Sequence, residues 1–136
     1  MHNEWDLQAA TVTIVEADTG EGGMVALAGR PDPMVEWGDS GMGRRPVVAL
    51  FIDPELGGGT GRPLVGEMRL SVRVGDGALG LESRLLDRLE EVLTPQAYAA
   101  LGLDVDLTWR GRPDLSSLEE SGKRRDGIVE FRMTRV

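Results

Sequence analysis

The stretch Glu67–Leu93, with the sequence EMRLSVRVGDGALGLESRLLDRLEEVL, combines two periodicities and decides the expected fold. Residues 67–74 alternate polar and apolar side chains, which predicts a strand with one face in the core and the other in water. From about Leu79 to Leu93, apolar residues recur at steps of three to five, and charged residues fill the opposite side. That spacing predicts an amphipathic helix, whose apolar side can cover the apolar face of the strand.

Three further segments are predicted to be strands. The apolar run Val47–Ile52 ends at Asp53-Pro54, which predicts a strand buried on both faces and placed centrally in a sheet. Residues 105–110 and 129–134 alternate as residues 67–74 do, so they predict two strands that each have one wet face. Thr94-Pro95 predicts the start of a second, short helix, because Thr is a good N-cap and Pro suits the first helical position.

The first 43 residues give a weaker pattern. Residues 5–16 place apolar side chains at helical spacing, but Thr11–Val15 is rich in β-branched residues that also suit a strand, and we favour a helix. Residues 18–43 are rich in Gly, Asp and Pro and predict a loop with short ordered pieces at Met24–Leu27 and Met34–Trp37.

Together the elements predict an α+β fold. We expect one domain, residues 1–136, in which a four-stranded, mostly antiparallel sheet is covered by the main helix as a two-layer sandwich. The uncovered face would carry charges of both signs. It is either a solvated face or a subunit interface, and its expected residues are Glu67, Arg69, Arg73, Asp106, Arg110, Glu130 and Arg132.

Composition argues against several classes of function. The chain has no cysteine and a single histidine, His2, so thiolate metal sites, cysteine nucleophiles and Ser/His/Asp catalysis lack their residues. A net charge of −8 gives no basic footprint for tight nucleic-acid binding. The N-terminus does not resemble a secretory signal, and no apolar run reaches the roughly 18 residues of a membrane span. We expect no membrane partner.

Two glycine-rich segments could be mistaken for phosphate-binding loops. Gly75–Gly80 matches G-x-G-x-x-G, but the strand before it alternates and too little chain follows for a dinucleotide-binding fold. Gly57–Pro63 lacks the P-loop lysine, since Lys123 is the only lysine. The carboxylate pairs Asp104/Asp106 and Glu90/Glu91 fit a solvated surface. We therefore expect no catalytic residues, no metal and no cofactor.

Loops that the core does not explain are the candidate partner interface. One is the glycine-rich connection, and the other is a basic turn near the C-terminus. Before that turn, Ser116 and Glu119 form a capping-box pattern that predicts a helical turn. The interface residues are Gly57, Gly58, Gly59, Thr60, Arg62, Lys123, Arg124 and Arg125.

The succession of elements resembles a known family of virion proteins. It comprises the strand VVALFIDPE, the glycine loop, the strand GEMRLSVRVGDG, the helix LESRLLDRLEEVLT, and the segment WRGRPDLSSLEESGKRRDGIVEFRMTRV. The N-terminal stretch EADTGEGGMVALAGRP is similar to the end of the family's first helix and the short segment that follows it. In this order and apolar pattern, the chain resembles the tail terminator or tail-completion (neck) proteins of long-tailed bacteriophages.

The resemblance implies a structural role and no enzymatic activity. It implies a homo-hexameric ring in the virion neck, assembled in the host cytoplasm, that caps the head-proximal end of the tail tube and ends its polymerisation. Implied partners are the tail tube protein and a head-to-tail connector or stopper, with DNA passing through the lumen without specific binding. Alternatives are another connector or stopper subunit, a monomeric interaction module, or a small nucleotide-binding protein or enzyme that uses the Gly75–Gly80 turn.

Overall fold

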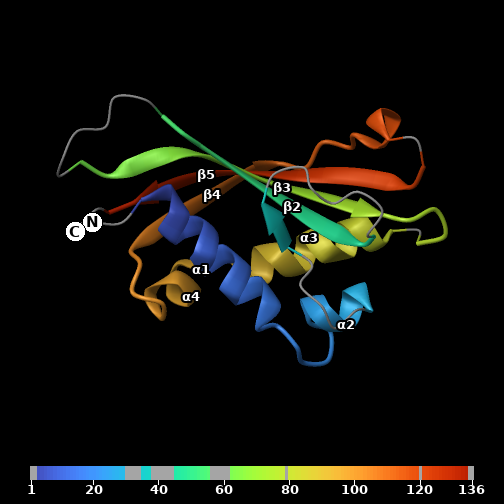
Figure 1. Cartoon of the computed structure of the whole chain (residues 1–136), viewed down its shortest axis with the longest axis horizontal. Helices are drawn as coiled ribbons and strands as arrows, with labels where there is room; N and C mark the ends of the chain where they lie inside the picture. The colour runs from blue at the N-terminus through green and yellow to red at the C-terminus, as the bar shows by residue number, and fades with distance from the viewer. Residues whose placement is uncertain are drawn as a thin grey trace.

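Helices lie on one face of a twisted sheet and leave the other face open (Figure 1). The computed structural model describes residues 3–29, 45–55, 62–78, 80–119 and 121–134, together with the backbone of residues 35–37. The helices of the covering layer are α1 (Glu4–Glu16), α2 (Met24–Ala28), α3 (Leu81–Val92) and α4 (Pro95–Ala99). This two-layer α+β arrangement confirms the predicted fold class.

The sheet has the strand order β1-β2-β3-β5-β4. Its strands are β1 (Val35–Trp37), β2 (Val47–Pro54), β3 (Leu64–Val74), β4 (Val105–Gly111) and β5 (Lys123–Met133). The four long strands pair antiparallel, as predicted, and the short β1 adds a parallel edge beside β2. The central strand is therefore β3. The predicted strand Val47–Ile52 does lie inside the sheet, between β1 and β3, and its first half is buried, but the middle strand is β3 and the second half of β2 is partly exposed.

The predicted basic turn at Lys123–Arg125 was wrong. These residues are the first of β5, because β3 is eleven residues long and its end, Val72–Val74, needs a partner. The turn lies just before them, at Gly122, whose φ of +85° is in the region that favours glycine. Its amide donates to the Asp76 carboxylate at 2.6 Å, which links this turn to the one after β3.

A helical turn, η1 (Ser116–Leu118), precedes this corner. The predicted helical turn is therefore confirmed, but the predicted capping box of Ser116 and Glu119 is not formed. Ser116 lies inside the turn, and its amide and hydroxyl both donate to the Asp114 carboxylate. The side chain of Glu119 takes part in ion pairs on the open face instead of capping the turn.

The N-terminal segment is helical, as favoured from the sequence. Asn3 caps α1 by accepting from the amides of Trp5 and Asp6, while the Asn3 amide donates to the Asp6 carboxylate at 2.8 Å. Leu7 and Val15 are fully buried against the rest of the core. Burial of these side chains by tertiary packing outweighs the weak intrinsic preference of β-branched residues for strands.

The predicted short helix is also confirmed. Thr94 caps α4 and accepts from the Ala97 amide at 3.2 Å. Tyr98 of this helix is fully buried, and its hydroxyl lies 2.7 Å from the Thr11 hydroxyl of α1. Burial raises the pKa of Tyr98 to about 12, because the phenolate would lose its solvation. The pair therefore satisfies two buried hydroxyls where α1 and α4 meet the sheet.

A charged pair fastens the α1–α2 connection to α3. Both oxygens of the Asp18 carboxylate accept from the Arg88 guanidinium at 2.7 Å, and Asp18 also accepts from the Met24 amide at 2.8 Å. The Asp18 side chain is only 11% exposed. The hydrogen bonds from Arg88 are the main reason that the pKa of Asp18 lies below its usual value.

We predict that Asp18→Asn destabilises the protein by about 1 to 3 kcal/mol at neutral pH, because it removes a charge-assisted pair. A lowered pKa in the folded state stabilises above the ordinary carboxyl range, and this contribution is lost as the pH falls through that pKa. Urea unfolding at pH 7 and at about pH 3 measures both effects. The variant should differ less from the wild type at the lower pH, and an equal difference at both would contradict the assignment.

Candidate functional site

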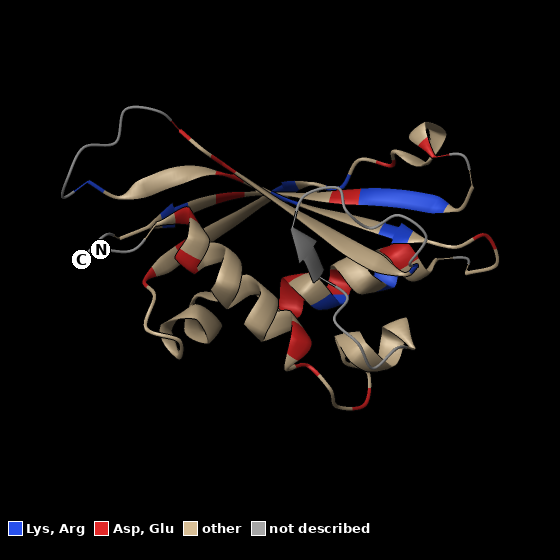
Figure 2. Ribbon diagram, in the orientation of Figure 1, with Lys and Arg blue, Asp and Glu red and all other residues tan. Residues whose placement is uncertain are grey.

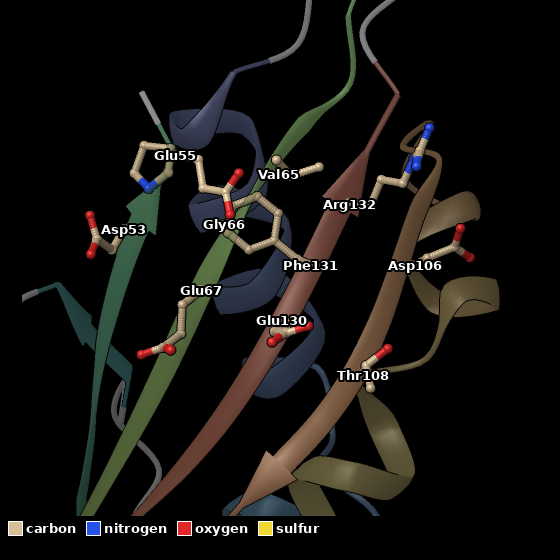
Figure 3. Close-up of a pocket in the computed structure, with 11 residues that line it drawn as sticks. Asp53, Glu55, Val65, Gly66, Glu67, Asp106, Thr108, Glu130, Phe131 and Arg132 are labelled. Atoms are coloured by element: carbon tan, nitrogen blue, oxygen red, sulfur yellow. The ribbon is translucent and has the colours of Figure 1, made fainter. Parts of the chain in front are cut away.

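The open face of the sheet is the candidate functional site. Alternate side chains of β2, β3, β5 and β4 point away from the helices, and the strand register aligns them in rows across the sheet. One row crosses all four strands and carries three carboxylates (Figure 3). Its members are Asp53, Glu67, Glu130 and Thr108.

A shallow groove of about 520 Å³, here called the acidic groove, follows this row. Five carboxylates line it, against one arginine, Arg132. Its lining residues are Asp53, Pro54, Glu55, Val65, Gly66, Glu67, Asp106, Thr108, Glu130, Phe131 and Arg132. The groove therefore carries a strong local excess of negative charge.

Some of these carboxylates are compensated locally and others are not. Glu130 accepts from Arg110 at 2.7 Å, and this hydrogen bond is the main reason that the pKa of Glu130 lies below its usual value. Arg69 lies 3.7 Å from Glu67. Within the part of the chain that the structure describes, Asp53 forms no ion pair, and neither do Glu55 and Asp106.

The other end of the open face carries a group of arginines, here called the arginine cluster: Arg45, Arg69, Arg73 and Arg124. They surround two acids, Asp126 and Glu119. Asp126 is fully buried and accepts from Arg124 at 3.1 and 3.2 Å.

Glu119, which follows η1, forms ion pairs with the arginine cluster. Its carboxylate accepts from Arg45 at 2.8 Å and lies 3.5 Å from Arg73. The side chains of Arg73 and Glu119 are 10% and 11% exposed, so this contact is largely shielded from water. The sequence predicts correctly that the Arg73 side chain lies on the open face. It does not predict that this side chain is largely buried there. Burial comes from the η1 segment, which contacts β5 and lies above the sheet in Figure 1.

A second groove of about 390 Å³ joins the two ends of the face. It is lined by Phe51, Asp53, Glu67, Arg69, Arg73 and Arg124, so it shares two carboxylates with the acidic groove. The open face is thus divided along the strands into an acidic end and a basic end. In Figure 2, acidic residues are red at the end of β2 and basic residues blue at the start of β5, and of the latter Arg124 is on the open face.

The described residues of the predicted partner interface do not form one patch. Gly57, Gly58, Gly59 and Thr60 lie outside the described residues, and Arg62 is exposed just before β3. Among the basic residues, Lys123 is exposed and Arg124 belongs to the arginine cluster. Arg125 points to the opposite side of the strand, where it donates to the Arg112 carbonyl at 2.9 Å and lies 3.6 Å from Asp114.

The Glu90/Glu91 pair and the Gly75–Gly80 segment have structural roles. Glu90 pairs with Arg112 at 2.6 Å and Glu91 with Arg88 at 2.9 Å. The Gly75–Gly80 segment follows a strand that is antiparallel to both neighbours, whereas a dinucleotide fingerprint belongs to a parallel strand-helix-strand unit. The segment instead turns the chain into α3, with Gly80 at a φ of +76°.

Sequence reasoning missed several residues of the open face. Asp126 had a detectable signal, because extending the alternation of residues 129–134 backwards places 126 on the same face as Glu130. Arg45 and Glu119 had none. Arg45 precedes β2 and Glu119 follows η1, so the two side chains meet only in the folded protein.

Searches for a functional assignment by similarity add no candidate. No protein-family model matches the chain, and a search of curated proteins finds no significant relative. Within the described ranges, no three His, Cys, Asp or Glu side chains group in a way that could hold a metal ion. Among the same residues, no helix is both long and apolar enough to cross a membrane.

We predict that Asp126→Asn destabilises the protein by about 3 to 5 kcal/mol, because it removes a fully buried negative charge that faces the arginine cluster. Glu130→Gln is the matched control, since it breaks an exposed pair and should cost much less. Chemical denaturation of both variants at neutral pH measures the difference. Equal costs would show that the cluster does not hold the fold together.

Gly66, which lines the acidic groove, is the basis of a second prediction. A Cβ added at Gly66 would meet the Asp53 carbonyl oxygen and lie 2.7 Å from Pro54 Cα, both on the rigid neighbouring strand. Gly66→Ala should therefore destabilise the protein by more than about 1 kcal/mol. Gly75→Ala is the control, because a Cβ there meets nothing within 4 Å. Similar thermal midpoints for the two variants would contradict the close approach of β2 and β3.

Proposed function

We propose that the chain is a structural subunit of the tail-terminator type. In this role, several copies, about six by the family resemblance, form a ring on the head-proximal end of a phage tail tube. The ring ends tube polymerisation and joins the tail to the head. The protein would act in the virion neck and would catalyse no reaction.

The observation that carries the proposal is the arrangement of the two layers. Helices α1 and α2, the β2–β3 hairpin, helices α3 and α4, and the β4–β5 hairpin follow one another, with the four α-helices on the same face of the sheet (Figure 1). This is the element order on which the family resemblance was based. It leaves the sheet face outside the η1 segment available for contacts with proteins.

The character of the open face supports a protein partner more than a small-molecule substrate. Its grooves are shallow, run across several strands and are lined mainly by charged side chains, whereas small-molecule pockets are concave and mostly apolar. Mixed polar surfaces of this kind are common at non-obligate protein interfaces. A chain with a net charge of −8 also suits a channel for DNA, because negative walls oppose binding to phosphates.

A head-to-tail connector or stopper subunit is the second candidate. It would share ring assembly and the absence of catalysis, but it would bind on the portal side and would not cap tubes. The same charge and the same open face are compatible with that role. Binding to tubes is therefore the measurement that separates the two candidates.

We predict that the purified protein caps tube ends and shortens tubes when it is mixed with polymerising tail tube protein from the same genome. Negative-stain electron microscopy counts capped ends and tube lengths, and light scattering gives the size of the free assembly. Tubes of unchanged length with bare ends would overturn the terminator role. Binding to portal-side proteins in that case would favour the stopper.

A pair of charge reversals tests the predicted loop interface within this experiment. Arg62→Glu changes an exposed residue of the predicted interface, and Arg84→Glu changes an exposed residue of α3. We expect the first to reduce capping and the second to leave it near the wild-type level. Equal effects would remove Arg62 from the interface without deciding the role of the ring.

A further inference from the structure

We propose that the open face of the sheet is a self-complementary surface through which two copies of this chain pair face to face, with their strands antiparallel. The proposal goes beyond the tail-terminator role and does not depend on it. The contact would be additional to those that close a ring, because a two-fold contact uses the same patch on both copies.

The charge distribution singles out a second copy as the partner. Among the described residues, the open face carries seven carboxylates and six arginines, so it is nearly neutral, whereas the whole chain carries −8. Its carboxylates are Asp53, Glu55, Glu67, Asp106, Glu119, Asp126 and Glu130, and its arginines are Arg45, Arg69, Arg73, Arg110, Arg124 and Arg132. A face with an acidic end and a basic end is complementary to a second copy of itself that is turned end to end.

The rows of the sheet give the register of this pairing. Glu67 and Arg69 are successive side chains of β3 on the open face, and Arg69 is opposite Phe51 while Glu67 is opposite Asp53. A two-fold axis that runs across the strands between these two rows places Glu67 over Arg69 of the second copy. Symmetry then repeats the contact, so each dimer gains two such pairs and brings each acidic end over a basic end.

Apolar side chains lie on the same face, close to the proposed axis. Phe51 and Ile128 flank Arg69 in its row, and both are partly buried in the single chain. Val65 is a third partly buried apolar residue, two residues before Glu67 on β3. Sheets that pack face to face are about 10 Å apart, which side chains of this size can fill. Nucleic acid does not fit the same face, because the acidic groove repels phosphates.

A charge swap tests the pairing. Glu67→Arg and Arg69→Glu each replace the two proposed attractive pairs with like charges, so each should raise the dimer dissociation constant by about tenfold or more. The double variant restores opposite charges across the axis and should return dimerisation to near the wild-type level. Sedimentation velocity from micromolar to millimolar protein measures all three against the wild type.

Two control variants test whether the effect is specific to the open face. Glu21→Arg and Arg84→Glu make the same changes in charge on exposed residues of the helix side, and they should leave dimerisation unchanged. The inference is overturned if the wild type stays monomeric throughout, if a control weakens pairing as much as a face variant does, or if the double variant fails to restore it. Tube capping plays no part in these outcomes, so failure here and failure of the proposed function are distinguishable.

A cross-linking measurement covers the case in which a charge variant does not fold or the wild type forms larger assemblies. The chain has no cysteine, so a single Thr108→Cys can be joined only to another copy. Thr108 is exposed in the row of Glu67, and a short bismaleimide should link it between copies. Arg84→Cys on α3 is the control. Efficient linking through α3 but not through Thr108 would overturn the proposed interface.

Discussion

The pairing of β3 with β5 is the constraint on which the rest of the structure depends. These strands are eleven residues long and aligned along their whole length. One side of the pair supplies fully buried side chains such as Met68, Leu70 and Val129, which the helices cover. Because side chains alternate along a strand, the same pairing fixes the rows of charges on the other side. Core and candidate site are therefore two faces of one structural element.

The buried ion pairs at the basic end have a different physical meaning from the exposed ones at the acidic end. Asp126 and Arg73 are shielded from water, and each has a charged partner, Arg124 for Asp126 and Glu119 for Arg73. Asp53, Glu55 and Asp106 meet no described cation. The basic end has four arginines around two acids, and the acidic groove has five carboxylates and one arginine, so the described face is asymmetric in charge along the strands. This asymmetry underlies the proposed pairing of two copies.

Much of the fold could be predicted because it follows from local periodicity. The alternation of residues 67–74 and the leucine spacing of α3 are properties of the chain itself, and both elements formed where expected. An apolar run predicts a buried strand but not how many strands lie beside it, so it could not show that the middle strand is β3 and not β2. The charges of Lys123–Arg125 hide the strand pattern, so the sequence predicts a turn there. Pairing with β3 made these residues part of β5.

The sequence by itself determined the α+β class, the charge of the chain and the polar residues of each strand, because these depend on composition and on spacing along the chain. Only the tertiary structure decided which charges meet. Arg45, Arg73, Glu119 and Asp126 come from separate segments, and strand register and the fold of η1 bring them together. Register is a relation between strands, so no single segment contains it. The division of the open face into acidic and basic ends follows from that relation.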